Sequence, residues 1–78
     1  LINVRVTREG KTEAMNSATV QQVIDEVNTE MDGNGRILVR PSGTENLLRV
    51  MVEAQTDEEA YNYAKRIADQ VSKEFGVE

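Results

Sequence analysis

The sequence predicts an α+β domain: a small, mostly antiparallel sheet of three to four strands with two helices packed on one of its faces, in the order β-α-β-β-α. Three segments, 1–7, 36–40 and 47–54, have the alternating or β-rich composition that is typical of strands. Two others, 17–31 and 56–75, place apolar side chains three or four positions apart, as helices with one apolar face do. Such helices need a sheet to cover, and 78 residues provide one domain with one small core.

The N-terminal half supplies one strand, one loop and one helix. Residues 1–7 alternate apolar and polar side chains, which indicates a half-buried strand. Residues 8–16 are polar and include a glycine, so we expect a loop or a hairpin excursion there. Asn16 or Ser17 can cap the helix that follows. The sequence DGNG at 32–35 ends this helix, because Gly and Asn adopt left-handed conformations. Its apolar face consists of Val20, Val23, Ile24, Val27 and Met31.

The C-terminal half supplies two strands and a second helix. The loop between the strands, PSGTEN at 41–46, has a length that suits a hairpin. Thr56 followed by Glu59 is a capping-box pattern, so we expect the last helix to begin there. A right-handed helical crossover makes the first two strands parallel, and the third strand can then lie between them, antiparallel to both. The apolar stripe of the last helix consists of Ala60, Ala64, Ile67, Ala68, Val71 and Phe75.

The composition excludes several classes of function. The chain has no histidine and no cysteine, which rules out a disulfide, a thiolate metal site and a Ser-His or Cys-His nucleophile pair. A net charge of −5 and an aromatic content of 4% argue against binding to nucleic acid or to a membrane surface. No apolar run is long enough for a membrane span, and no signal peptide is visible. Because the chain begins with Leu1, we expect it to be a piece of a longer protein.

The acidity is distributed unevenly along the chain. Residues 33–50 contain three arginines and one glutamate, a net charge of +2, whereas the remaining residues carry a net charge of −7. The three arginines are Arg36, Arg40 and Arg49, which lie in or beside the predicted hairpin. A positive patch is therefore expected around the loop RPSGTEN of an otherwise acidic domain.

This loop has the composition of a phosphate-binding site. Arg40 offers a guanidinium fork that matches phosphate oxygens, and Arg49 can add a second positive charge. Ser42 and Thr44 offer hydroxyl donors. Gly43 accepts unusual dihedral angles, so that backbone N–H groups can converge on an anion. The residues therefore support the hypothesis of a site for a phosphate group.

The same residues also fit an ordinary hairpin loop. Pro, Ser, Gly and Thr are common in turns, and arginines beside a turn are often solvated charges of an edge strand. Glu45 opposes an anion, and the loop is no nucleotide P-loop because a strand follows it. The acidic residues at 57–59 suit the positive end of a helix dipole better than a metal site. The residues alone leave two interpretations open: a phosphate site, or an interaction module without phosphate chemistry.

The segment GRILVRPSGTENLLRVMVEA, residues 35–54, closely resembles a signature near the C-terminus of the α-D-phosphohexomutase superfamily, and in particular of its bacterial phosphoglucosamine mutases. The core Arg-x-Ser-Gly-Thr-Glu marks the superfamily, and LLRVMVEA is more similar to the phosphoglucosamine branch. The opening INVRV and both predicted helices resemble the same region, so the likeness covers essentially the whole chain. It implies that residues 1–78 form a single domain, the C-terminal (fourth) domain of a longer enzyme.

The resemblance implies an activity in which this chain takes only a part. Such enzymes interconvert glucosamine 6-phosphate and glucosamine 1-phosphate, in the cytoplasm, on the route to UDP-N-acetylglucosamine and peptidoglycan. A phosphoserine and a magnesium ion of other domains support the phosphoryl transfer, so we expect no catalytic residue and no metal site in this chain, and no activity of the chain alone. The implied partners are the sugar phosphate and the other domains of the same chain, without nucleic acid or membrane.

By the same resemblance, the last domain binds the phosphate that is not being transferred. The implied contacts are Arg40, Ser42, Gly43 and Thr44, with Arg49 as a further contact. The family usually has a proline after SGTE, where this chain has Asn46. Asparagine tolerates turn geometries, so we expect the loop to form but to be more mobile.

Overall fold

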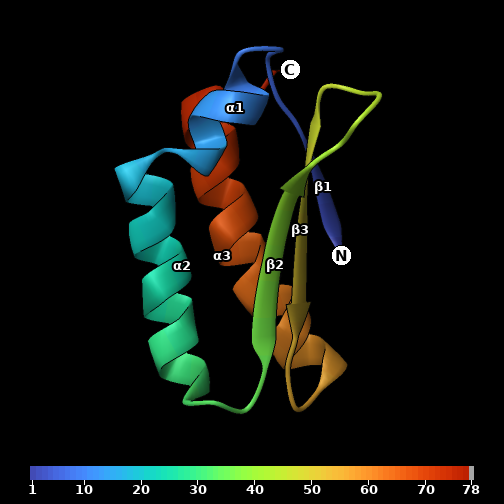
Figure 1. Cartoon of the computed structure of the whole chain (residues 1–78). Coiled ribbons are helices and arrows are strands. Elements are labelled where there is room, and N and C mark those ends of the chain that lie inside the picture. Colours follow the sequence, from blue (N-terminus) through green and yellow to red (C-terminus); the bar gives the residue numbers. More distant parts are fainter. Residues whose placement is uncertain (78) are drawn as a thin grey trace.

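The computed structural model describes residues 1–77 and contains one three-stranded antiparallel sheet (Figure 1). Its strands are β1 (Ile2–Arg5), β2 (Arg36–Pro41) and β3 (Leu47–Glu53), in the spatial order β1-β3-β2. β3 pairs antiparallel with both neighbours, which confirms the predicted place of the third strand. The helices lie on one face of the sheet, which confirms the predicted α+β class. They are α1 (Gly10–Met15), α2 (Ala18–Met31) and α3 (Asp57–Phe75).

The alternation of side chains along the strands gives the sheet two different faces. Val50 in β3 lies opposite Ile2 in β1 and Val39 in β2, and these three side chains pack into the core beneath the helices. Successive side chains of a strand point to opposite faces. Arg49 and Met51, on either side of Val50, therefore point to the outer face and are exposed.

One cluster of buried apolar side chains joins the sheet to the helices. Within residues 1–77, no buried side-chain nitrogen or oxygen lacks a hydrogen-bond partner. One apolar core therefore serves both the sheet and the helices. Its buried members are Val4, Val6, Ala14, Val20, Val27, Met31, Leu48, Val50, Val52, Ala64, Ile67, Ala68 and Val71.

α2 and α3 begin at the residues that the sequence predicts as caps. The Ser17 hydroxyl accepts a hydrogen bond from the N–H of Val20 at 3.3 Å, and the Thr56 hydroxyl accepts one from the N–H of Glu59 at 3.1 Å. The sequence DGNG ends α2, as expected, and Gly33 is left-handed; the C-cap, however, is Asp32, with a φ of 49°, and not a Gly or Asn. Among the helices described, none is long and apolar enough to span a membrane.

Residues 10–15 form the short helix α1, so the predicted loop or hairpin excursion is wrong, and three helices rather than two cover the sheet. Gly10 and Ala14 are buried, and the Thr7 hydroxyl accepts a hydrogen bond from the Gly10 N–H at 3.0 Å. A Cβ on Gly10 would lie 2.8 Å from Thr7 Oγ1 and 3.0 Å from the Cβ of Phe75. The glycine thus allows α1 to pack closely on the end of α3. So short a helix, with two small buried residues, leaves no periodic signal in the sequence.

The segments that follow β1 and α3 run side by side. Val6 and Gly76 form an isolated antiparallel bridge, and the Val77 N–H donates to the Arg5 carbonyl at 3.1 Å. These bonds tie the end of α3 to β1. The sheet itself has three strands, within the predicted range of three to four.

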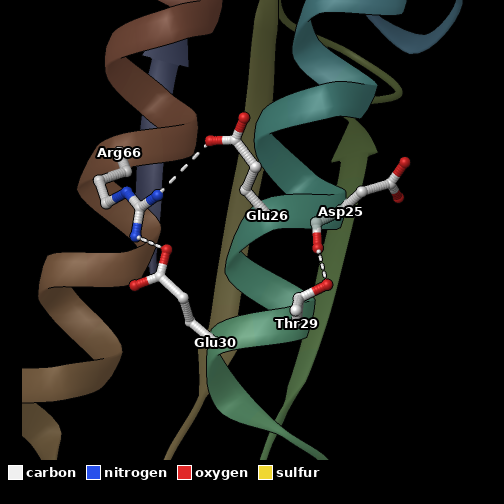
Figure 2. A network of polar contacts seen from close by, with 5 residues as sticks. All are labelled: Asp25, Glu26, Thr29, Glu30 and Arg66. Carbon is white, nitrogen blue, oxygen red and sulfur yellow. Dashed lines mark hydrogen bonds and ion pairs between the residues drawn. The ribbon is translucent and has the colours of Figure 1, made fainter.

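α2 and α3 lie side by side and are connected at the surface by Arg66 (Figure 2). Arg66 Nη1 lies 2.7 Å from Glu30 Oε2, and its Nη2 lies 3.8 Å from Glu26 Oε1. Within α2, the Thr29 hydroxyl donates to the Asp25 carbonyl at 3.0 Å (Figure 2). The paired side chains are 40–53% exposed, and exposed pairs contribute only about 0–1 kcal/mol each. The apolar core, rather than this network, holds the two helices together.

Glu74, near the end of α3, connects α3 to the start of α2. Its carboxylate accepts hydrogen bonds from the Gln70 amide at 2.6 Å and from the Thr19 and Ser17 hydroxyls at 2.5 and 3.1 Å. These bonds, of which the one from Gln70 has the largest effect, lower the pKa of Glu74 below the ordinary value of a glutamate. The carboxylate also lies at the N-terminus of α2, where a negative charge is favourable.

We expect the Glu74 contacts to stabilise the fold at neutral pH and to be lost in acid. The pKa of Glu74 is lower in the folded state than in the unfolded state, so the stabilisation is complete above the unfolded value and disappears as the pH falls through the folded value. Glu74→Gln should therefore lower the free energy of unfolding at neutral pH and have no effect in strong acid, as measured by urea denaturation. In an NMR titration, Gln70→Ala should raise the Glu74 pKa, and an unchanged pKa would contradict this account.

Gly35, directly before β2, leaves no room for a side chain. A Cβ there would overlap the Glu53 carbonyl oxygen and lie 3.0 Å from the Met31 sulfur. Gly35→Ala should push β2 away from β3 and lower the free energy of unfolding by about 1–3 kcal/mol, measured by urea denaturation. Gly43→Ala is the matched control, because nothing lies within 4 Å of the Cβ that it would add; it should change the stability by less than about 0.5 kcal/mol. Equal losses would refute the steric explanation.

Candidate functional site: an anion-binding loop beside two opposed arginines

The two arginines predicted for the site lie together on the outer face of the sheet. Arg40 in β2 and Arg49 in β3 are directly opposite each other in the β2–β3 register, and both are exposed. Side chains in such positions have Cβ atoms about 4.5–5.5 Å apart. Within residues 1–77, neither arginine forms an ion pair with a carboxylate. Two guanidinium groups without a counter-charge therefore share one patch of surface, where an anion would relieve their repulsion.

The outer face of the sheet is basic although the domain is acidic. The strand register also places Arg5 and Arg36 on this face. Among the strand residues there, Glu53 supplies the opposing charge, and it is paired with Arg36 at 3.1 Å. Leu38 and Met51 lie beside the two opposed arginines, with which they line a shallow hollow of about 130 Å³. The net positive charge of this face is thus concentrated at the end of the sheet nearer to the 42–46 loop.

The Ser42 side chain closes the loop that follows β2. The Ser42 N–H donates to the Leu47 carbonyl at 2.9 Å, across the base of the loop. The Ser42 hydroxyl oxygen accepts from the N–H groups of Thr44 at 3.4 Å and Glu45 at 3.2 Å. A hydroxyl that accepts two such bonds keeps its own proton free to donate. Ser42 therefore both orders the loop and can offer an O–H donor to an anion.

Gly43 lies in the loop, but not for the conformational reason that the sequence predicted. Within residues 1–77, a positive φ occurs only at Asp32 and Gly33, so the expectation of an unusual dihedral angle at Gly43 is wrong. Nothing lies within 4 Å of the position that a Cβ on Gly43 would occupy. What the glycine contributes is an uncovered backbone, to which another molecule can come close.

Lys11 of α1 also contacts the loop, and sequence reasoning missed it. Its Nζ donates to the carbonyl oxygens of Ser42 at 3.0 Å and Glu45 at 2.9 Å. The contact joins residues that are 31 and 34 positions apart in the chain. Figure 1 shows α1 at the same end of the molecule as the loop. Only a prediction of helix at residues 10–15 could have suggested that Lys11 lies there.

Glu45 and Asn46 hold the loop through backbone atoms. The Asn46 carbonyl accepts a hydrogen bond from the Val6 N–H at 3.0 Å, and a proline at this position would keep that carbonyl. Glu45 and Asn46 line a hollow of about 600 Å³ with Arg5, and of the predicted phosphate contacts only Thr44 borders it. Glu45 therefore lies near the positive charge of Arg5. This charge offsets part of the repulsion that Glu45 would exert on a bound anion.

The site provides donors for an anion rather than ligands for a metal. Guanidinium groups, hydroxyls and free loop amides are the groups that recognise phosphate oxygens in proteins. Within residues 1–77, no three acidic, histidine or cysteine side chains are grouped so that they could hold a metal ion. The residues present therefore do not fit a magnesium site, and we assign no step of this domain to that ion.

These features define a small α+β domain in which an ordered loop with hydrogen-bond donors lies beside a basic sheet face. Residues 1–70 match the family described as phosphoglucomutase/phosphomannomutase, C-terminal domain, and the chain belongs to this family. Over all 78 residues it is 59% identical to a protein named phosphoglucosamine mutase from Staphylococcus haemolyticus and 58% identical to one from Geobacillus kaustophilus. Over 77 residues it is 53% identical to the protein of that name from Streptococcus uberis. The chain spans 17% of the length of each relative. The resemblance that the sequence indicated is confirmed.

Arg49→Gln should relieve the repulsion between the opposed arginines when no anion is bound. Because like charges directly opposite in a sheet are destabilising, we expect the variant to raise the free energy of unfolding by about 0.2–1 kcal/mol at low ionic strength. Salt screens exposed charges, so this gain should vanish at high ionic strength. Urea denaturation at the two salt concentrations measures both values.

The matched control for this comparison is Arg5→Gln. Arg5 lies on the same face but opposite Leu47, an uncharged partner. It should show no gain in stability at low ionic strength. If Arg5→Gln stabilised the fold as much as Arg49→Gln, or if neither variant did, the repulsion between Arg40 and Arg49 would be refuted.

Proposed function

We propose that the chain, residues 1–78, is the fourth and last domain of a phosphoglucosamine mutase, in which it binds the phosphate of the substrate that is not being transferred. The parent enzyme, an isomerase of the phosphohexomutase kind, would interconvert glucosamine 6-phosphate and glucosamine 1-phosphate for UDP-N-acetylglucosamine and peptidoglycan synthesis. Identities of 58–59% to proteins named phosphoglucosamine mutase support this choice within the family. A cytoplasmic location belongs to the same proposal, because phosphorylated sugars are charged and do not cross membranes freely.

The observation that carries the proposal is the opposed pair of Arg40 and Arg49 beside an ordered loop. A phosphate dianion placed there would neutralise both guanidinium groups and accept hydrogen bonds from Ser42, Gly43 and Thr44. Each hydrogen bond to a charged group contributes about 1.5–3 kcal/mol. The positive patch within an acidic domain favours a small anion at this one place.

A site for the remote phosphate has a clear use in a mutase. Binding energy from a group that does not react can position the end of the substrate that does. A site that recognises phosphate oxygens alone can also take either phosphate of a sugar bisphosphate, as the turnover of such an intermediate requires. In this proposal the phosphoserine and the magnesium ion belong to other domains of the parent chain. The 78-residue chain alone binds phosphate but does not catalyse the reaction.

The alternative function is a regulatory or protein-interaction module without phosphate binding. That function requires no order in the loop, which would lie free in the solvent. The bonds of Lys11 and Ser42 instead hold five backbone atoms of the 42–46 loop. This order favours the phosphate site over the alternative.

Inorganic phosphate and glucosamine 6-phosphate should both bind at the loop of the 78-residue chain. We expect the amide NMR signals of residues 40–45 and of Arg49 to shift on titration, with a Kd on the order of 1 mM because the rest of the substrate cleft is missing. Glucosamine, which lacks the phosphate, should leave these signals in place. Unmoved signals at high phosphate concentration would refute the phosphate site.

Arg40→Ala should weaken phosphate binding by about tenfold or more, because a hydrogen bond between charged groups is worth about 1.5–3 kcal/mol. Arg36→Ala is the matched control, since Arg36 lies on the same face but is paired with Glu53. It removes the same charge and should leave the Kd within about twofold of the unchanged chain. Equal losses would mean that only the overall charge matters, and Arg40 would then be no contact.

A further inference from the structure

The contact between Lys11 and the loop is made to backbone atoms and not to a charged group. The Lys11 side chain is half-buried, and both of its acceptors are carbonyl oxygens of the same loop, those of Ser42 and Glu45. Within the part of the chain that the structure describes, Lys11 forms no ion pair. One ammonium group thus bridges the two carbonyls that flank Gly43 and Thr44, and it fixes the path of the backbone between them.

The bridged carbonyls also fix the direction of an amide. In a planar trans peptide unit, the C=O and N–H bonds point in opposite directions. The Ser42 carbonyl points to Lys11, so the N–H of the same peptide unit, which belongs to Gly43, points away from Lys11. This N–H donates no hydrogen bond within residues 1–77, and the Gly43 Cα carries no side chain to cover it. The hydroxyl of Ser42, the preceding residue, can donate a second hydrogen bond.

We propose that Lys11 is a positioning residue of the anion site: its ammonium group holds the Ser42 and Glu45 carbonyls on one side of the loop, so that the Gly43 amide is presented on the other side. This inference rests on the proposed function of the loop. Lys11 does not touch the phosphate in this arrangement. It orders the donors before the anion arrives, so binding does not cost the entropy of ordering the loop.

The packing of α1 places Lys11 at the loop end of the sheet. Gly10 begins the helix and packs against Phe75, with no space for a Cβ between them. The next residue along the chain is Lys11, so the close packing of Gly10 determines where the Lys11 side chain starts. The helix therefore carries the lysine at a defined distance from the loop.

Three variants of the 78-residue chain test the inference by NMR titration with inorganic phosphate. Lys11→Met keeps a long side chain but loses all three donors, and we expect its Kd to be about three- to tenfold weaker, the loss typical of one net hydrogen bond. Lys11→Arg keeps donors that can reach the carbonyls and should restore a Kd within about twofold of the unchanged chain. Lys73→Met is the matched control, because Lys73 is an exposed lysine of α3, and the lysine hydrogen bonds to the loop come from Lys11. It loses the same charge and should bind as the unchanged chain does.

The outcomes separate this inference from the proposed function. If the unchanged chain and Lys73→Met show no shifts at residues 40–45, the phosphate site itself is wrong. If both bind phosphate and Lys11→Met binds it equally well, the phosphate site stands and the role of Lys11 is refuted. If Lys11→Met and Lys73→Met weaken binding equally, the effect is one of net charge, and the positioning role is again refuted.

If Lys11→Met does not fold, a measurement on the unchanged chain tests the positioning role of Lys11. If Lys11 holds the loop, the amides of residues 43–45 are rigid without phosphate. Their ¹⁵N order parameters should be about 0.85, like those of the strands. Order parameters below about 0.6, typical of a flexible segment, would overturn the inference.

Discussion

The site depends on the register in which β3 pairs with its two neighbours. Leu48 and Val50 must be buried beneath the helices, and the alternation of a strand then sends Arg49 to the outer face. A register shift of one residue would bury an arginine and expose a valine. Burying an unpaired charge costs several kcal/mol, whereas the repulsion between the opposed Arg40 and Arg49 costs about 0.2–1 kcal/mol. Burial of the apolar side chains therefore determines the register, and this register places Arg40 and Arg49 opposite each other.

The loop takes part of its order from the helical layer of the fold. α1 packs on the end of α3 through Gly10, and from there Lys11 reaches the carbonyls of Ser42 and Glu45. The arginines come from the sheet and the hydroxyls from the loop. The lysine that contacts the loop carbonyls comes from α1, which lies far from the loop in the sequence. Three elements with separate roles thus meet at one end of the domain, and the core that joins them keeps their relative positions.

The distribution of charge suits a small anion better than a large one. The domain as a whole is acidic, with a net charge of −5, and a polyanion would meet repulsion over most of its surface. At physiological ionic strength, interactions between exposed charges are screened beyond about 8 Å. A phosphate group at the loop would therefore be influenced mainly by the nearby arginines and the loop donors. Local geometry, rather than net charge, decides which anion can be held.

The three strands, α2 and α3 can be predicted from the sequence because their apolar side chains recur with a fixed period. The helix caps and the place of the loop can be predicted because single residue types are typical of those positions. The family resemblance of the sequence also pointed to Arg40 and Arg49. The folded structure was needed to show that these arginines oppose each other and that Gly43 has no positive φ. It alone revealed α1 and the reach of Lys11 to the loop. The contacts of Lys11 join segments 31 and 34 positions apart, which packing brings together without any repeating pattern. The two arginines lie on neighbouring strands, but the residue types alone leave open the register in which those strands pair.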